Sequence, residues 1–182
     1  TDFEFIIIND GSTDNSKEII ESYEDNRIKL ISNSENIGIA ASLNKGLEIA
    51  KSEFIARLDS NDSAFSNRLE KQYDFLMNNP DYGMVTSPVI HQSEDRSEKI
   101  SGEHIPDKLI PTTLLFRNCV FHSAVMYRKS ALPITGYNEK CYAEDYDLWI
   151  RMIFKWKINI IKDPLSKVRE LKAGLRFKTP KK

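Results

Sequence analysis

Short apolar runs alternate with helical spacings along the first half of the chain. Residues 3–8 include three consecutive isoleucines, which predict a strand buried on both faces, as in parallel sheets. Residues 27–31 alternate apolar and polar side chains, which predicts a strand nearer a sheet edge, and a third strand is predicted over 54–58. The segments after the first two strands have helical spacing, the second through Ala40, Leu43, Leu47 and Ala50.

The second half continues this order less regularly. Residues 67–78 predict a helix with Leu69, Tyr73, Leu76 and Met77 on its apolar side. Residues 82–90 predict a strand bent at Pro88, and the charged segment 92–101 is expected to be a mobile loop. The remaining expected elements are a helix over 106–116 that restarts at Pro111, a strand over 123–127, a helix over 144–155 and a strand over 158–161, with no element beyond Pro164.

Helices placed between strands require crossover connections, so the order predicts an α/β fold with a mainly parallel central sheet flanked by helices. A chain of 182 residues has the size of one domain with a full core. We expect this domain to span 1–168 and to be followed by an irregular basic tail over 169–182.

Charge and cysteine usage exclude several classes of function. The formal net charge is −1, from 26 basic and 27 acidic residues, which gives no general attraction to nucleic acid. Cys119 and Cys141 lack metal-ligand spacing and fit a reducing cytoplasm, and no apolar run is long enough to span a bilayer. The tail could touch the inner face of a membrane peripherally through its basic residues, although solvated disorder is the alternative. These residues are Arg176, Lys178, Lys181 and Lys182. The oligomeric state stays open.

The segment Arg57–Asp62 carries the most concentrated candidate chemistry. Two carboxylates and a carboxamide, from Asp59, Asn61 and Asp62, directly follow a predicted strand. In an open α/β sheet such side chains face the crevice where ligands bind, and their oxygens suit Mg²⁺ or Mn²⁺. The alternative is a polar turn that caps the next helix.

Asp10 stands at the end of the first predicted strand, where a carboxylate can accept a hydrogen bond from a base or a ribose. Gly11 allows the backbone to approach a neighbour closely. The alternative is a cap on the following helix. The chain contains neither G-x-G-x-x-G after this strand nor a Walker A lysine loop, which disfavours dinucleotide enzymes and P-loop NTPases.

Glu144 and Asp145 open the predicted helix that carries Trp149. One interpretation is a general base held at a rigid helix start. The other is electrostatic, because acids in a first turn stabilise a helix by about 0.3–1 kcal/mol through the macrodipole.

Four blocks, in order, resemble the family 2 glycosyltransferases. Residues 5–16 resemble the family's nucleotide-binding signature, and residues 36–47 resemble its second block, with Asn36-Ile37-Gly38 and Asn44-Lys45-Gly46-Leu47. Residues 54–72 resemble the D-x-D segment, and residues 143–151 resemble the catalytic-base motif. The four blocks cover nearly the whole chain.

The resemblance implies a GT-A fold, which is Rossmann-like and binds a nucleotide-sugar. It implies an inverting transfer of a hexose or N-acetylhexosamine, from a UDP-linked donor to a glycan or lipid-linked acceptor, in cell-surface polysaccharide synthesis. Asp145 would be the general base, supported by Glu144, and a divalent Mn²⁺ or Mg²⁺ would be held at Asn61 and Asp62. The donor-binding residues would be Asp10, Gly11, Ser12, Gly38, Asn44, Arg57 and Asp59.

Three departures from the family pattern support an alternative. Asn61 is a neutral carboxamide where the family places its metal-binding acid, and Leu171 stands where a histidine is frequent. The family's opening strand and helix, roughly 30 residues, have no counterpart before Thr1. The alternative is therefore a truncated, catalytically impaired or non-catalytic remnant that at most binds nucleotide. A sugar nucleotidyltransferase is a further alternative.

Overall fold

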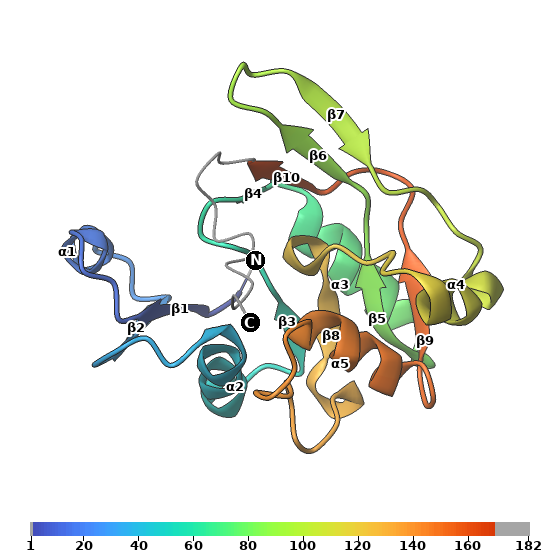
Figure 1. Cartoon of the computed structure of the whole chain (residues 1–182), viewed down its shortest axis with the longest axis horizontal. Helices are drawn as coiled ribbons and strands as arrows, with labels where there is room; N and C mark the ends of the chain where they lie inside the picture. The colour runs from blue at the N-terminus through green and yellow to red at the C-terminus, as the bar shows by residue number, and fades with distance from the viewer. Residues whose placement is uncertain (1, 170–182) are drawn as a thin grey trace, which may run out of the picture. The chain divides into compact units, whose positions relative to one another are not determined.

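The computed structural model describes residues 2–169 (Figure 1). The predicted basic tail, from residue 170 onward, lies outside the described residues, as does Leu171. The chain divides into two compact units, and each contains two stretches of sequence. The first unit is Thr1–Ile55 with Arg128–Trp156, and the second is Ala56–Tyr127 with Lys157–Lys182.

The first unit begins with a parallel pair of strands. β1 (Phe5–Asp10) pairs with β2 (Ile28–Asn33) in a register that runs from Phe5 opposite Ile28 to Asp10 opposite Asn33. Because parallel strands need a crossover, α1 (Ser16–Glu21) joins them. The remaining elements of this unit are α2 (Ile39–Ile49), the 3₁₀ helix η3 (Lys129–Ala131) and α5 (Glu144–Met152).

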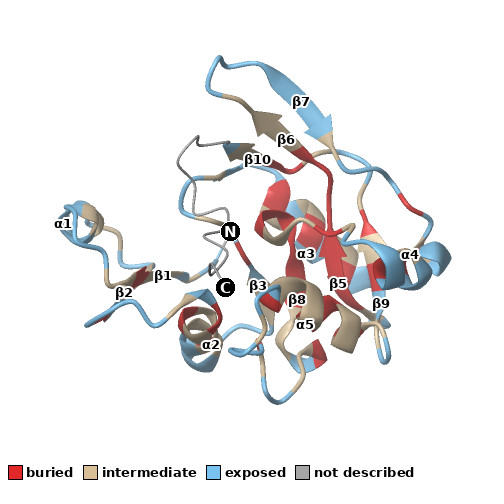
Figure 2. Cartoon of the chain, viewed as in Figure 1, coloured by how far each residue is buried: buried red, intermediate tan, exposed pale blue. Residues whose placement is uncertain are grey.

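The predicted burial of the first strand on both faces is wrong. Phe5 is 47% exposed and Ile6, Ile7 and Ile8 are half-buried. Among the described residues β1 pairs only with β2, and α1 has no buried residue, so α1 shields little of the strand (Figure 2). α2 does approach β1 closely, because a Cβ added to Gly46 would lie 2.9 Å from Ile8 Cδ1.

α5 forms where the sequence predicts a helix, although it ends three residues earlier, at Met152. Leu148, Trp149 and Met152 are each at most 1% exposed, so the apolar face of the helix is fully buried. A face buried to this extent fixes the rotation and position of the helix, and with it the backbone of its first turn.

The second unit contains most of the strands. In chain order its elements are β4 (Ser63–Ala64), α3 (Arg68–Asn78), β5 (Tyr82–Thr86), β6 (Val89–Gln92), β7 (Glu98–Ser101), η1 (Asp107–Leu109), α4 (Ile110–Phe116), η2 (His122–Ala124), β8 (Met126–Arg128), β9 (Lys157–Ile160) and β10 (Ser166–Arg169). One sheet has the strand order β4-β10-β6-β7. The other has the order β3-β8-β5-β9, where β3 is Phe54–Ala56. The chain passes between the units three times, in β3, in β8 and directly before β9.

Both larger sheets are mixed, which corrects the expectation of a mainly parallel sheet. β5 is parallel to β9 but antiparallel to β8, and β6 is parallel to β10 but antiparallel to β7. The segment predicted as a mobile loop, 92–101, contains β7 and closes a hairpin with β6. Its charged side chains are exposed, so the segment lacks the apolar pattern from which a strand is predicted. β10 lies beyond Pro164, where no element was predicted.

α3 has a buried face that its apolar spacing predicted only at Leu76. The buried residues are Arg68, Gln72 and Leu76, whereas Tyr73 is 45% and Met77 53% exposed. Buried residues are red in Figure 2, and they concentrate on α3 and β5 in this unit. No helix within residues 2–169 is both long enough and apolar enough to cross a membrane.

Candidate active site

Asp10 lies at the end of β1 and closes the loop that leads into α2. Its carboxylate accepts hydrogen bonds from Asn33 Nδ2 at 2.9 Å and from the backbone N–H groups of Ile37 and Gly38, each at 3.0 Å. α1 begins after Asn15 without a side-chain cap, so Asp10 does not cap the following helix. The carboxylate is held by the chain's own donors at the edge of the parallel pair.

Hydrogen bonding keeps Asp10 ionised. Partial burial acts to raise the pKa of this carboxyl group, but the hydrogen bonds from Ile37, Asn33, Ser42 and Gly38 outweigh burial and lower the pKa. Asp10 is therefore a fixed anionic acceptor at neutral pH.

Two glycines shape this loop. Gly11 has φ of 71°, and a Cβ at this position would lie 2.6 Å from Asn36 N and 2.6 Å from the carbonyl carbon of Glu35. The close backbone approach predicted for Gly11 is thus made to the chain's own 35–36 segment. Gly38, the N-cap of α2, has φ of 92° and open space where a Cβ would be. Ser12 is exposed, and its N–H donates to Asn9 Oδ1 at 2.9 Å.

Asn44 joins α2 to the loop that precedes α5. Its Nδ2 donates to Tyr137 O and to Glu139 Oε1, both at 3.0 Å, and its Oδ1 accepts from Tyr137 N at 2.8 Å. A Cβ on Gly136 would lie 2.5 Å from Asn44 Oδ1. Both ends of the carboxamide hold backbone, so the structure gives this predicted donor-binding residue a positioning contact within the first unit.

Asp10→Asn is expected to lower the free energy of unfolding by about 1 kcal/mol at pH 7, because an amide replaces an ionised acceptor of several hydrogen bonds. The lowered pKa of Asp10 means that its stabilisation is present above the unfolded-state pKa and is lost as the pH falls through the folded-state pKa. Urea denaturation of both proteins between pH 7 and pH 3 measures this difference.

Asp14→Asn is the matched control, since Asp14 is exposed in the same loop and bonds only locally, to Ser16 N at 3.0 Å. A stability gap between wild type and Asp10→Asn that stays constant down to pH 3 would contradict the role given to the Asp10 carboxylate.

In the second unit, Asp59 is fixed by Arg57 and Ser123. The Arg57 guanidinium pairs with both carboxylate oxygens, with Nη1 at 2.6 Å from Oδ2. Ser123 Oγ donates to Asp59 Oδ2 at 2.7 Å and accepts from Asp59 N at 3.2 Å. Arg57 is 8% exposed, whereas the Asp59 side chain is 41% exposed. A buried guanidinium thus holds a carboxylate that solvent and ligands can reach.

The buried polar face of α3 contacts the backbone that carries the Arg57–Asp59 pair. Arg68 Nη2 donates to Arg57 O at 2.7 Å and to Val125 O at 3.0 Å, and its Nε donates to Gln72 Oε1 at 3.0 Å. Burial lowers the pKa of Arg68 to about 10, and the positive charge of Arg57 adds to this effect. Burial likewise lowers the pKa of the neighbouring His122 well below its usual range.

Asn61 and Asp62 bind the backbone of one residue in β10. Asn61 Nδ2 donates to Arg169 O at 3.1 Å, and Asp62 Oδ1 accepts from Arg169 N at 3.1 Å. The D-x-D-like segment is therefore joined to the strand that sequence reasoning missed. Neither residue caps α3, whose N-cap is Asn67 without a side-chain hydrogen bond.

These residues fit a divalent cation only incompletely. Residues 2–169 contain no group of three or more acidic, histidine or cysteine side chains that could enclose a metal. Asp59, Asn61 and Asp62 offer hard oxygen atoms, but Arg57 pairs with Asp59 and Arg169 N with Asp62. Mg²⁺-type sites with one or two carboxylates are completed by substrate phosphates and water. The donor set fits a cation shared with a diphosphate.

Glu144 and Asp145 form the first turn of α5, together with Asp147. Glu144 is 8% exposed, and Asp145 is half-buried, with Oδ1 accepting from Tyr146 N at 2.7 Å. Asp147 pairs with Arg151 at 2.7 Å, and Arg151 Nη2 also donates to Gly136 O at 2.8 Å. The turn is acidic and is held in place by the buried face of the helix. It follows closely in sequence the loop around 136–139, which Asn44 contacts.

The predicted site residues thus fall into two groups. The first unit contains Asp10, Gly11, Ser12, Gly38, Asn44, Glu144 and Asp145, and the second contains Arg57, Asp59, Asn61 and Asp62. Sequence reasoning missed the roles of Asn33, Ser123, Arg68 and Gln72. A signal for the last two existed, because their i, i+4 spacing places both on one side of α3.

Comparison with known proteins identifies the family of the chain. The family model described as Glycosyl transferase family 2 matches residues 1–134. An uncharacterised glycosyltransferase of Methanocaldococcus jannaschii is 35% identical over 175 residues, which are 92% of this chain and 60% of that protein. The O-antigen biosynthesis glycosyltransferase WbnJ of Escherichia coli is 33% identical over 162 residues, 84% of this chain and 61% of that protein. The chain spans about three fifths of the length of these relatives.

Solved structures share the fold. TarS of S. aureus (residues 1–349), solved in complex with UDP-GlcNAc, has a TM-score of 0.70 at 17% identity, covering 93% of this chain and 50% of that one. The mannosyltransferase PcManGT of Pyrobaculum calidifontis, in complex with GDP-Man and Mn²⁺, has a TM-score of 0.69 at 16% identity, covering 94% and 49%. At these identities the likeness concerns the fold.

The mixed sheets and this structural likeness define an α/β protein of the GT-A glycosyltransferase fold. The match over residues 1–134 makes the assignment more specific. The chain belongs to glycosyltransferase family 2.

Proposed function

We propose that this protein transfers a hexose or N-acetylhexosamine, with inversion, from a UDP-linked donor to a glycan or lipid-linked acceptor in cell-surface polysaccharide synthesis. The observation that carries the proposal is the acidic first turn of α5, on a helix whose face is fully buried. Asp145 there deprotonates the acceptor hydroxyl, which then attacks the anomeric carbon as the nucleoside diphosphate leaves. Glu144 supports the base.

Donor binding is assigned to the strand ends. Asp10, ionised and fixed by Asn33 and by the 37–38 backbone, accepts hydrogen bonds from the nucleotide base. Asp59, held by Arg57, contacts the ribose and the metal. The neighbours described in complex with UDP-GlcNAc and GDP-Man support a nucleotide-sugar donor, and the biosynthetic role of WbnJ supports a polysaccharide acceptor.

Binding and hydrolysis of a panel of UDP-sugars and GDP-mannose, with Mn²⁺ and without an acceptor, tests this function. We expect one UDP-sugar to bind and to be hydrolysed slowly. If no nucleotide-sugar in the panel binds, as measured by calorimetry at millimolar concentration, the proposed function is refuted.

A bound Mn²⁺ or Mg²⁺ would neutralise charge on the departing diphosphate as a Lewis acid. Asp59, Asn61 and Asp62 would hold it, and PcManGT, described in complex with Mn²⁺, supports the assignment. Asn61 contributes a neutral oxygen, which weakens the site. We place the reaction in the cytoplasm at the membrane's inner face, where lipid-linked acceptors are available.

Asn61→Asp is expected to tighten Mn²⁺ binding in the presence of UDP by about tenfold, or about 1.4 kcal/mol, because a carboxylate replaces a carboxamide. Titration of Mn²⁺ followed by electron paramagnetic resonance measures free metal directly. Asn78→Asp, which adds the same charge at the exposed end of α3, is the matched control.

Asn61 also favours a second candidate, a domain that binds nucleotide without transferring sugar. Donor hydrolysis by the wild type and by Asn61→Asp distinguishes the two functions. If Asn61→Asp hydrolyses donor while the wild type does not, the wild-type metal site does not support hydrolysis. The second candidate, a domain that binds nucleotide without transferring sugar, is then supported. If the wild type itself turns over donor, the second candidate is refuted. Unchanged metal affinity in Asn61→Asp contradicts the assignment of Asn61 to the metal.

A further inference from the structure

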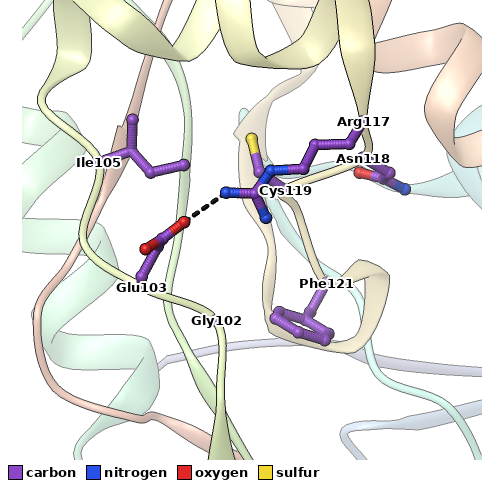
Figure 3. A pocket seen from close by; sticks show the side chains of 7 residues that line it. All are labelled: Gly102, Glu103, Ile105, Arg117, Asn118, Cys119 and Phe121. Carbon is purple, nitrogen blue, oxygen red and sulfur yellow. Dashed lines mark hydrogen bonds and ion pairs between the residues drawn. The ribbon is translucent and has the colours of Figure 1, made fainter.

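A hollow of about 100 Å³ lies in the second unit, between the segment that follows β7 and the segment that follows α4 (Figure 3). It is distinct from the residues assigned to donor and base. Its walls include Glu103, Arg117 and Asn118 on the polar side and Ile105 and Phe121 on the apolar side.

The polar wall offers hydrogen-bonding capacity to a ligand. Glu103 and Arg117 form an ion pair across the hollow, and their side chains remain 65% and 59% exposed (Figure 3). A guanidinium has five donor hydrogens and a carboxylate about four acceptor positions, so one ion pair leaves most of them available. Asn118 Oδ1 accepts from Val120 N at 3.0 Å, which orients its amide.

The apolar wall is held by the surrounding chain. Ile105 is 7% exposed, and the Phe121 ring packs edge-to-face against His91 with centroids 5.9 Å apart. Gly102 has φ of 92°, and a Cβ there would lie 2.8 Å from Phe121 Cε2. The phenyl ring can lie close to this backbone because residue 102 is glycine.

We propose that this hollow is a saccharide subsite that receives part of one sugar ring of the acceptor. A pyranose ring presents hydroxyl groups at its edge and C–H groups on its face, and these match the ion pair and amide on one side and the phenyl ring on the other. The acceptor role rests on the proposed function. Phe121 stands two residues before Ser123, whose hydroxyl binds Asp59. One short segment therefore contributes both to the hollow and to the surroundings of Asp59.

The size of the hollow limits what it holds. Drug-sized ligands occupy pockets of about 300–1,000 Å³, and a volume of about 100 Å³ accommodates a few waters or part of one sugar ring. Neighbouring sugar residues of the acceptor would therefore lie outside it.

Cys119 lines the hollow and provides a built-in reporter. Burial raises the pKa of its thiol, and the charge of Arg117 lowers the pKa by a smaller amount, so alkylation is measured at alkaline pH. The chain has two cysteines, and Cys141→Ser leaves Cys119 alone. Its rate of alkylation by iodoacetamide is measured by mass spectrometry, with and without methyl glycosides of N-acetylglucosamine, glucose, galactose and rhamnose.

We expect at least one glycoside to slow alkylation about threefold or more, the effect of a ligand at twice its Kd. Mannitol at the same concentration should have no effect. In Arg117→Ala the protection should fall to near onefold, while Lys108→Ala, a change at an exposed residue outside the hollow, should retain it. Because Arg117 also affects the thiol pKa, the ratio with and without glycoside is compared within each variant.

Three results overturn the subsite: no glycoside slows alkylation more than mannitol, Cys141 in a Cys119→Ser protein is protected equally, or only a UDP-sugar protects. The assay with glycosides needs neither bound donor nor turnover, and the UDP-sugar is added only as a competing ligand, so its outcome is separate from that of the proposed function. Protection without sugar transfer under any donor condition supports the subsite and contradicts the glycosyltransferase proposal. Sugar transfer without protection contradicts the subsite and supports the glycosyltransferase proposal.

Discussion

Asp145→Asn should lower the rate of sugar transfer by about 10²- to 10⁴-fold, the contribution of a positioned general base, while the donor Kd stays within about twofold. The amide keeps the size of the side chain and its place in the first turn of α5, but it cannot take a proton from the acceptor hydroxyl. Single-turnover transfer, with donor affinity measured by calorimetry on the same protein, separates the two quantities.

Asp147→Asn is the matched control, because Asp147 lies in the same turn and pairs with Arg151. Both substitutions remove a negative charge near the helix N-terminus, so both should cost about 0.3–1 kcal/mol of stability. Only Asp145→Asn should lower the rate of transfer to the extent expected for loss of the base. If the two variants lose stability equally and neither loses turnover, the acidic turn serves the helix macrodipole and the base lies elsewhere.

Arg68→Met should lower the free energy of unfolding by about 3 kcal/mol or more. Arg68 is 1% exposed and donates to Arg57 O, Val125 O and Gln72 Oε1. Val125 O keeps its hydrogen bond from Arg57 N, but Arg57 O and Gln72 Oε1 lose the donor that Arg68 supplies, and each buried acceptor left without a donor costs about 1–3 kcal/mol. Methionine has a similar length and a good helix propensity, so the loss measures the hydrogen bonds more than packing. Guanidinium denaturation followed by tryptophan fluorescence and circular dichroism gives the difference.

Lys71→Met, on the same helix, is the control, because Lys71 is 40% exposed and pairs with Asp163 at the surface. It should change stability by less than about 0.5 kcal/mol. If Arg68→Met folds, its donor Kd reports on Asp59, since Arg68 supports the backbone of Arg57. Stability of Arg68→Met within about 1 kcal/mol of wild type would contradict the structural role of this residue.

Local patterns were sufficient to predict the position of several helices and strands, although not the burial of the first strand. The strand ending at Asp10, the helix over Ile39–Ile49 and the helix with Leu148, Trp149 and Met152 were predicted within a few residues. The bend at Pro88 was also predicted, since proline removes a ladder donor: β5 ends at Thr86 and β6 begins at Val89. The GT-A fold and the family follow from the order of four sequence blocks.

Pairing direction was not predictable, because it depends on partners distant in sequence. β5 pairs with residues 126–127 in one direction and with 157–160 in the other, and no local pattern encodes that choice. β7 was missed because its side chains are charged and exposed. β10 was missed because its strand partners are β6 and β4, far away along the chain.

The sequence by itself determined the family, the helix and strand order of the first half, and the identity of the acids at Asp10, Asp59 and Asp145. Only the tertiary structure decided what those acids contact: the 37–38 backbone at Asp10, and Arg57 with Ser123 at Asp59. It also decided that α3 buries Arg68 and Gln72. The physical reason is that a polar residue becomes buried when distant carbonyl groups complete its hydrogen bonds, and those carbonyls are brought near only by folding.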